Sequence, residues 1–435
     1  MIITIMVLNL TEKQKNAFDA IIKGYNVFLT GPAGSGKSYL LNTIIEYFNQ
    51  NNIDNVYKTS LTGISALLLK GTTLHRYAGI GLGNKSIDFY IKQIYKNKNI
   101  KNRWLTTNIL IIDEISMLTV ELFEKLEKIA REIRKNNKPF GGIQIIMSGD
   151  FFQLPPVDSY INNSFCFQSS LWNEVINKTF NFDEIKRQSD SKFQLILNKV
   201  RVGNIDAEVK EVLNSCLHKK LVNEYGIIPT IILSKKLMVK EHNKIEEEKL
   251  LNKKYIFKSK INHININKEY IAQYMEIFNK SIDIEDEQIF SIGSQVMLIV
   301  NKPDDNLANG SLGKIIDFEN GIPIVLFLNG IQKKINPYIW YLNDTTKSTD
   351  PNISKEQLPL IPAWAITIHR AQGATLEYII TDIGDSIFEF GQAYVVLSRV
   401  KSLEGLSLLN INFKKIKANK LVVEYYNNLK LLNIK

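Results

Sequence analysis

Short apolar runs alternate with longer amphipathic stretches from about residue 10 to residue 180. The apolar runs at 27–30, 109–112 and 143–148 have the length and composition of buried strands. Between the last two, apolar residues recur at steps of three and four, which predicts a helix from Thr119 to Lys135 with one face toward a core. Its apolar positions are Leu122, Leu126, Ile129 and Ile133. Strands that alternate with helices predict a parallel sheet flanked by helices, an α/β fold.

The polar positions of the helix at 119–135 carry charges in a regular order. Acidic and basic residues stand four apart in three pairs: Glu121–Lys125, Glu124–Lys128 and Glu127–Arg131. Pairs at this spacing are neighbours on a helix surface and stabilise it weakly in water. We therefore interpret these charges as a solvated face rather than as a site.

The second half of the chain has a different pattern of polar and apolar residues. Residues 250–290 are rich in Lys and Asn and predict helix and loop. From 292 to 342, short β-like runs are cut by Gly, Asn and Pro, which predicts a small all-β module. The polar stretch 343–359 predicts an exposed loop, after which helix and strand alternate again to the end.

The turn between the first predicted strand and a helix-like run at 39–48 has the sequence GPAGSGKS. A G-x-x-x-x-G-K-[ST] pattern in this setting is a phosphate-binding P-loop, whose glycines let backbone N–H groups point at phosphate oxygens. Lys37 would place its charge on the β- and γ-phosphates of ATP, and Ser38 would offer a hydroxyl to Mg²⁺. The predicted nucleotide-binding residues are Gly31, Pro32, Ala33, Gly34, Ser35, Gly36, Lys37 and Ser38.

Residues suited to hydrolysis follow. The second apolar run leads directly into Asp113 and Glu114, which predicts one carboxylate that holds Mg²⁺ and one that polarises the attacking water. Gln153, in SGDFFQLPPV, would hydrogen-bond the γ-phosphate or that water. Arg187 and Arg399 would stabilise charge that develops on the γ-phosphate. Since a lone arginine is more often part of a surface ion pair, these two assignments depend on the motifs around them.

Composition limits the class of protein. The chain has 435 residues, enough for two to four domains, and its 54 Lys and Arg against 44 Asp and Glu favour a polyanionic partner. Its two cysteines form no disulfide framework, and its five histidines show no zinc-ligand spacing. The apolar opening MIITIMVLNL is too short to span a membrane and lacks the features of a signal peptide. We therefore expect an intracellular protein of the nucleus or cytoplasm with no membrane partner.

Seven segments carry a resemblance to a known family. They are GPAGSGKS, LTGISALLLKGTTLHRYAGIG, LIIDEISM, GGIQIIMSGDFFQLPPV, IKRQSDSKF, TIHRAQGATL and YVVLSRV. Their order resembles that of superfamily-one helicases, in particular the petite-integration-frequency branch, a relative of RecD whose members are 5′-to-3′ DNA helicases. The segment LFEKLEKIAREIRKNNKPFGGIQ is similar to that branch's distinguishing sequence. Ala371 stands where a Ser is common in that branch.

The resemblance implies two RecA-like domains with two insertions. The first domain would cover residues 1–180 and include a strand-separating wedge at about 76–103. The second would cover 181–291 and 346–435, interrupted at 292–345 by an SH3-like β barrel. ATP would bind between the two RecA-like domains and close them.

The resemblance also implies roles for single residues. Gln14, in LTEKQKNAFDAI, would read the adenine edge. Four residues would lie along the path of single-stranded DNA: Thr62, His75, His369 and Thr375. For each histidine a satisfied core or capping group is the alternative. The basic run of the wedge is either a solvated face or a surface that contacts duplex DNA; its members are Lys92, Lys96, Lys98, Lys101 and Arg103.

Together these features predict an ATP-dependent DNA helicase that moves 5′ to 3′ on single strands and unwinds duplex DNA. Its cofactors would be ATP and Mg²⁺, and its work would be in replication, recombination, repair or telomere maintenance. We expect a monomer in solution, with self-association on DNA as the alternative. Two other functions stay open: a motor that translocates or strips proteins without useful unwinding, and a nucleic-acid-binding scaffold that uses ATP only as a structural switch. The intact hydrolysis residues speak against the scaffold.

Overall fold

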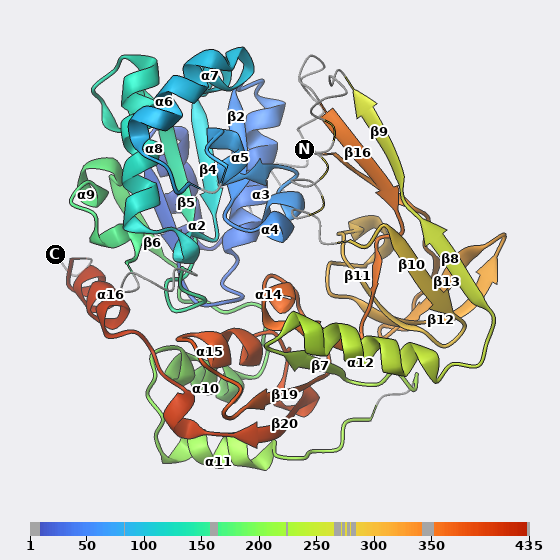
Figure 1. Ribbon diagram of the computed structural model, residues 1–435. Coiled ribbons are helices and arrows are strands. Elements are labelled where there is room, and N and C mark those ends of the chain that lie inside the picture. Colours follow the sequence, from blue (N-terminus) through green and yellow to red (C-terminus); the bar gives the residue numbers. More distant parts are fainter. Residues whose placement is uncertain are drawn as a thin grey trace. The chain divides into compact units, whose positions relative to one another are not determined.

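The protein forms two compact units in the computed structural model, the first ending at Lys186 and the second beginning at Arg187 (Figure 1). The structure describes residues 9–81, 83–156, 164–222, 225–264, 271, 275, 279, 284–341 and 352–432. None of the helices in these ranges is both long enough and apolar enough to cross a membrane.

The first unit is built on a parallel sheet of six strands in the order β3-β2-β4-β5-β1-β6. The strands are β1 (Val27–Thr30), β2 (Val56–Ser60), β3 (Thr72–Thr73), β4 (Ile109–Asp113), β5 (Gln144–Ser148) and β6 (Lys178–Asn181). All three strands that the apolar runs predict are present. The central strands are buried on both faces, as expected for a parallel sheet covered by helices.

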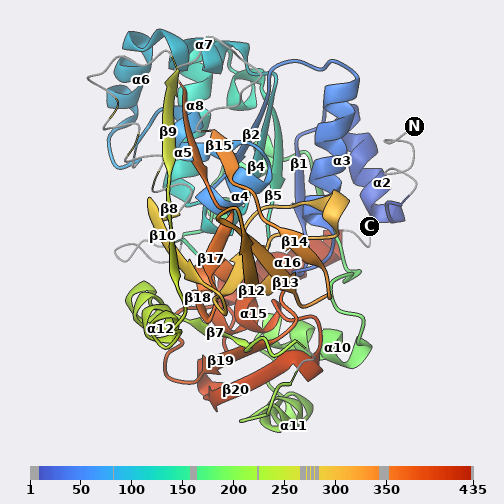
Figure 2. The same ribbon diagram turned by 90° about the vertical axis from the view of Figure 1, so that its right-hand side faces the viewer.

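Helices cover both faces of this sheet. Figures 1 and 2 show α2 and α3 on one face and α6, α7 and α8 on the other. The helices are α2 (Glu12–Ile22), α3 (Lys37–Gln50), α4 (Gly63–Leu68), α5 (Leu74–Ala78), α6 (Ile87–Lys96), α7 (Lys98–Thr106), α8 (Val120–Arg134) and α9 (Trp172–Val175). Val27 and Leu29 pack toward α2 and α3, whereas Phe28 between them contacts the rings of Phe151 and Trp172. Strand β1 therefore packs its side chains into a hydrophobic layer on each face of the sheet.

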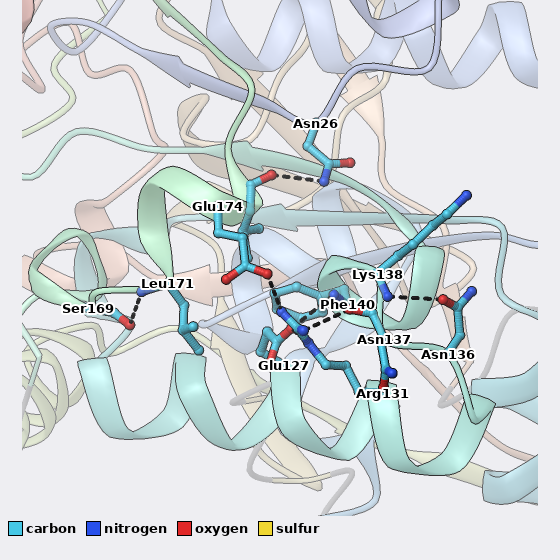
Figure 3. A network of polar contacts seen from close by, with 11 residues as sticks. Asn26, Glu127, Arg131, Asn136, Asn137, Lys138, Phe140, Ser169, Leu171 and Glu174 are labelled. Atoms are coloured by element: carbon cyan, nitrogen blue, oxygen red, sulfur yellow. Dashed lines mark hydrogen bonds and ion pairs between the residues drawn. The ribbon is translucent and has the colours of Figure 1, made fainter.

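Helix α8 forms where the 3.6-residue period predicts it, but its polar face is not uniformly solvated, and that interpretation was wrong. The side chain of Glu127 is 1% exposed, and its carboxylate pairs with Arg131 and accepts the backbone N–H of Phe140 at 3.3 Å. Arg131 also donates to Glu174 at 2.6 Å and to the carbonyl of Asn137 at 2.7 Å (Figure 3). The pairing of Glu127 is thus part of the core.

The other charge pairs of α8 also have partners outside the helix. Lys125 is 8% exposed and donates to Glu121 at 2.6 Å and to the carbonyl of Gly83 at 2.8 Å. Glu124 accepts a hydrogen bond from the hydroxyl of Ser169 at 2.7 Å. The i,i+4 spacing is correct, but spacing alone does not reveal which side of the helix other segments cover.

The second unit contains a parallel sheet of four strands in the order β18-β7-β19-β20. Its strands are β7 (Thr230–Leu233), β18 (Ala365–Thr367), β19 (Ile379–Ile383) and β20 (Leu406–Ile411). The helices of this unit are α10 (Ser191–Arg201), α11 (Ala207–Ser215), α12 (Lys236–Glu248), α14 (Ile368–Ala371), α15 (Gln392–Leu397) and α16 (Lys420–Leu432). Two parallel sheets flanked by helices confirm the predicted α/β class.

Three antiparallel sheets complete the second unit (Figure 2). They have the orders β14-β13-β12-β11-β17, β10-β8 and β15-β16-β9. Their strands are β8 (Lys254–Lys258), β9 (Lys260–Ile264), β10 (Glu287–Ser291), β11 (Gln295–Leu298), β12 (Leu312–Glu319), β13 (Ile322–Phe327), β14 (Gln332–Lys334), β15 (Tyr338–Tyr341), β16 (Asn352–Gln357) and β17 (Leu360–Pro362). The short strands predicted between 292 and 342 are present. Whether they close into an SH3-like barrel stays a prediction.

Two predictions about polar segments in this region were wrong, one of them in part. Within 250–290 we expect helix and loop; residues 271, 275 and 279 are helical, but strands β8, β9 and β10 also occur. Within the predicted loop 343–359, residues 352–357 form β16, and the positions before 352 lie outside the described residues. Lysines conceal the two-residue period of both segments. In β16 the alternating Ile353 and Lys355 are both fully buried, and the ammonium of Lys355 binds Asp286 at 2.7 Å.

Candidate nucleotide and DNA sites

The P-loop follows β1 and ends where α3 begins at Lys37. Gly31, Gly34 and Gly36 all have positive φ, at 142°, 80° and 84°. At Gly31 an added Cβ would lie 2.3 Å from the carbonyl oxygen of Phe182, so no other residue fits there. The loop therefore has the backbone that the sequence pattern predicts for a phosphate cradle at a helix N-terminus.

The two P-loop side chains that we assign to ATP chemistry stand at the first turn of α3. The ammonium of Lys37 donates to the carbonyls of Gly31 and Pro32 at 2.8 and 2.9 Å. Ser38 is exposed. Lys37 thus lies over the loop that would hold the phosphates, within reach of an anion placed there.

Asp113 is the last residue of β4 and is 7% exposed. Its carboxylate accepts a hydrogen bond from the hydroxyl of Ser65 at 3.0 Å. Burial raises the pKa of Asp113, and the positive charge of Lys37 opposes this rise. The carboxylate and the P-loop lysine are therefore electrostatic neighbours, as a shared phosphate and metal site requires.

Glu114 has a backbone conformation that is costly for a residue with a Cβ. Its φ and ψ are 57° and 41°, in the left-handed region. Such conformations cost about 1–3 kcal/mol and cluster at functional sites. The turn at Glu114 separates β4 from the 3₁₀ turn Ile115–Met117 and aims the side chain differently from those of the strand.

The loop that carries Gln153 packs against this turn. A Cβ at Gly149 would lie 2.9 Å from the backbone nitrogen of Ile115, so the segments after β4 and β5 touch here. Gln153 is buried, and its backbone N–H donates to the carbonyl of Asp150 at 2.9 Å. The fold thus brings the two sequence-distant motifs to one edge of the sheet.

Gln14 has a structural role that the sequence does not reveal. Its side chain is fully buried, and its Oε1 accepts the backbone N–H of Thr11 at 3.0 Å, forming a capping box at the start of α2. Its Nε2 donates to the carbonyl of Ser35 at 3.3 Å. Gln14 therefore links α2 to the P-loop. A role in reading adenine stays a prediction.

In the second unit, Arg187 and Arg399 converge on one residue. Arg187 donates to the carbonyl of Ser398 at 3.1 Å, while Arg399 donates to the Ser398 hydroxyl at 2.8 Å. Gln188 is 1% exposed and its amide donates to the carbonyls of Ser398 and Val400 at 3.2 and 2.9 Å. The sequence pattern does not single out Gln188, because nothing in IKRQSD distinguishes a buried, hydrogen-bonded amide from an exposed one.

Hydrogen bonds connect each predicted DNA-contacting threonine to a residue that we assign to the ATP site, either directly or through one other residue. The hydroxyl of Thr375 accepts from Nε of Arg187 at 3.0 Å. The hydroxyl of Thr62 accepts the backbone N–H of Ser65 at 3.2 Å, and the side chain of Ser65 in turn binds Asp113. Both links lie within a single unit, so each unit joins its own two motifs.

The two predicted DNA-contacting histidines share one property. Burial lowers the pKa of His75 and of His369, so the imidazoles are neutral near pH 7. His75 belongs to α5 and His369 to α14. A neutral imidazole can donate one hydrogen bond to a phosphate but brings no charge to it.

Comparison with known proteins places these motifs in a family. The sequence profile of the PIF1-like helicases matches residues 9–211. The ATP-dependent DNA helicase PIF1 of Xenopus laevis is 36% identical over 428 residues, a match that covers 97% of this chain and 65% of that protein. The crystal structure of the Pif1 helicase from Candida albicans is 35% identical with a TM-score of 0.78, over 97% of this chain and 99% of the other. The chain belongs to the PIF1-like helicase family.

A further PIF1-like structure adds a DNA complex to the comparison. It is a Pif1 helicase solved at forked double-stranded DNA, 28% identical with a TM-score of 0.64, over 97% of both chains. The chain spans about two thirds of the Xenopus relative's own length. The PIF1-like fold confirms the two RecA-like parallel sheets, whereas the roles of single residues and the domain boundaries stay predictions.

Proposed function

We propose that this PIF1-like chain is an ATP-dependent DNA helicase that moves 5′ to 3′ on single strands and unwinds duplex DNA. The observation that carries the proposal is the link between the two kinds of motif. In the first unit Thr62 reaches Asp113 through Ser65, and in the second Thr375 binds Arg187 directly. A protein that bound ATP without coupling it to DNA binding would not need these hydrogen bonds.

The residues around the P-loop suit ATP with Mg²⁺. Mg²⁺ prefers oxygen ligands and usually binds one or two carboxylates together with phosphates and water. The exposed hydroxyl of Ser38 and the carboxylate of Asp113 supply this donor set. Among the described residues, no cluster of three or more His, Cys, Asp or Glu side chains could hold a metal ion instead. Bound Mg²⁺ would supply charge neutralisation at the phosphates.

The protein's own groups would carry the remaining steps. Lys37 would leave the carbonyls of its loop for the β- and γ-phosphates, and Glu114 would orient and polarise the attacking water. Gln153 would hold that water or the γ-phosphate. Arg187 and Arg399, fixed through Ser398, would stabilise the charge of the transition state.

The partners that we propose are single-stranded and forked DNA. The formal net charge of +10 favours a polyanion, and contacts mainly to phosphates make binding tolerant of sequence and sensitive to salt. We further propose that the protein acts as a monomer in replication, recombination, repair or genome maintenance. The names of the relatives, ATP-dependent DNA helicases, support a role on DNA.

The substitution Lys37→Ala tests the ATPase half of the proposal. We expect hydrolysis to fall by at least about 100-fold, because a charge that stabilises the transition state is lost. Binding of a fluorescent oligonucleotide should change by less than about twofold, since Lys37 is assigned no DNA contact. The matched control is Lys23→Ala, an exposed lysine just after α2, which should leave both quantities unchanged. Hydrolysis that single-stranded DNA does not stimulate in the wild-type protein would contradict the proposal.

A further inference from the structure

A cavity of about 570 Å³ lies in the first unit between the segment that follows α5 and helices α6 and α7. Its volume falls in the range that holds small organic groups. Ile80 and Tyr90 are nearly fully buried, so they form a solid apolar floor. The hydroxyl of Tyr90 accepts the backbone N–H of Lys85 at 2.9 Å and so fixes the rim. None of these residues is among those assigned to ATP chemistry.

One wall of this cavity is formed by Phe89 and Gln93 of α6 and by Asn97, the residue between α6 and α7. Phe89 and Gln93 stand four residues apart, so they lie on one face of the helix. Phe89 is 45% exposed, so its side chain is accessible from the cavity. Asn97 caps α7 through its Oδ1, which accepts the N–H of Ile100 at 3.1 Å, and its amide nitrogen is the donor that this side chain can offer to a ligand.

This combination matches the chemistry of a nucleobase. An aromatic face stacks on any base, and such a contact is worth about 1–3 kcal/mol. Side-chain amides both donate and accept, as the edges of bases require. A purely apolar ligand would leave the two amides unpaired, and a purely anionic one would gain nothing from Phe89.

The surroundings favour a ligand that also carries phosphate. Between residues 84 and 103 there are six basic residues and one acidic residue, Asp88, which gives a net charge of +5. The basic residues are Lys85, Lys92, Lys96, Lys98, Lys101 and Arg103. Lys85 stands at the rim itself, and Lys92, Lys96 and Lys98 are exposed along the same helices. A cavity that fits a base and has several lysines around it suits a nucleotide within a nucleic-acid strand, because a strand brings several phosphates with each base.

We infer that the cavity takes one unpaired nucleotide of forked DNA, with its base against Phe89 and on the amides of Gln93 and Asn97, and its phosphate near Lys85. The inference rests on the proposed function, because it needs a partner with a strand junction. Holding one base out of the stack repays part of the cost of opening the next pair. With a nucleotide bound in the cavity, the basic residues of α6 and α7 would contact DNA rather than form a solvated face.

A double-mutant cycle tests the inference by combining a substitution in the protein with an abasic nucleotide in the DNA. Forks carry a single abasic nucleotide at successive positions around the junction, on one strand and then on the other. At one position we expect the missing base to weaken binding by the wild-type protein about 10-fold, and Phe89→Ala to weaken binding of the intact fork by a similar factor. The two changes together should cost no more than either alone, since both remove the same contact. Gln93→Leu should behave like Phe89→Ala.

The control variant is Tyr95→Ala, which removes an exposed aromatic ring of the same helix that does not line the cavity. It should show additive losses at every position. Because Phe89 is half exposed, its truncation should leave the unfolding midpoint and DNA-free ATP hydrolysis as in the wild type. Additive losses for Phe89→Ala at every abasic position would overturn the inference and leave the helicase proposal intact. Wild-type protein that does not bind forks at all would instead contradict the proposed function.

Discussion

At the scale of single residues, two threonine hydroxyls connect the motifs that we assign to DNA with those that we assign to ATP. The Thr375 hydroxyl accepts a charge-assisted hydrogen bond from Arg187 at 3.0 Å. The same hydroxyl still has a proton to donate, and a DNA phosphate is a suitable acceptor for it. A phosphate contact at Thr375 would therefore hold the threonine in the rotamer that orients the arginine.

The substitution Thr375→Val tests this link while it preserves the shape of the side chain. The guanidinium of Arg187 loses an acceptor worth about 1.5–3 kcal/mol, so we expect the kcat of hydrolysis at saturating single-stranded DNA to fall roughly 10- to 100-fold. Thr375→Ser keeps the hydroxyl and should retain most of the activity. The measurement is steady-state ATP hydrolysis with and without DNA, alongside the DNA dissociation constant. A Val variant with wild-type kcat would show that the hydrogen bond has no part in coupling.

The sequence predicts the residues of the candidate site but not the contacts that hold them in place. The pattern of the P-loop and the buried strand before Asp113 made those assignments possible, because backbone geometry follows from glycine spacing and strand direction. Gln188 and the capping role of Gln14 could not be predicted, since a buried amide looks like an exposed one in a sequence. The contact of Arg187 with Ser398 joins residues far apart in the sequence and depends on the tertiary fold, whereas Arg399 binds its neighbour Ser398.

At the scale of elements, α8 shows how a charged face can become part of a core. Arg131 bridges Glu127 of its own helix and Glu174 of α9, and these contacts raise the pKa of its guanidinium (Figure 3). Glu127 also accepts the N–H of Phe140, which has a φ of 49° within the 3₁₀ turn Pro139–Gly142. The helix therefore supports the strained turn at Phe140.

The substitution Glu127→Ala should be strongly destabilising. It leaves the N–H of Phe140 buried without its acceptor and removes one partner of Arg131, which together should lower the free energy of unfolding by about 2–4 kcal/mol. The matched control is Glu132→Ala on the same helix, whose half-exposed carboxylate pairs with Lys135, and it should change stability by less than about 0.5 kcal/mol. Urea unfolding followed by circular dichroism measures both. Equal stabilities for the two variants would mean that Glu127 belongs to a solvated face after all.

Elements with regular apolar spacing were predicted correctly, whereas polar strands were not. The strands β1, β4 and β5 have apolar runs, and α8 has a clear 3.6-residue period. In β8, Tyr255 and Phe257 are half-buried while Lys254, Ile256 and Lys258 are exposed, a two-residue period of burial that the exposed Ile256 hides in the sequence. The ring of Phe318 on β12 stacks on Tyr255 at 3.7 Å between centroids, a contact that only the fold creates.

At the scale of the whole molecule, the order of motifs was the most informative feature of the sequence. It predicted two parallel sheets and membership of a helicase family, and the similarity to PIF1-like helicases over 97% of the chain confirms both. The direction of movement and the ability to unwind are properties of complete cycles of ATP hydrolysis on DNA. They cannot be deduced from the hydrogen bonds within one unit.

Unwinding of partial duplexes with a 5′ tail, a 3′ tail or no tail is the most direct test of the proposed function. With ATP and Mg²⁺ present, we expect rapid strand release from the 5′-tailed duplex, little from the other two, and none with Lys37→Ala. A protein that displaces streptavidin from a tailed strand but separates no duplex would be a translocase rather than a helicase. Preferential unwinding of the 3′-tailed duplex would contradict the account.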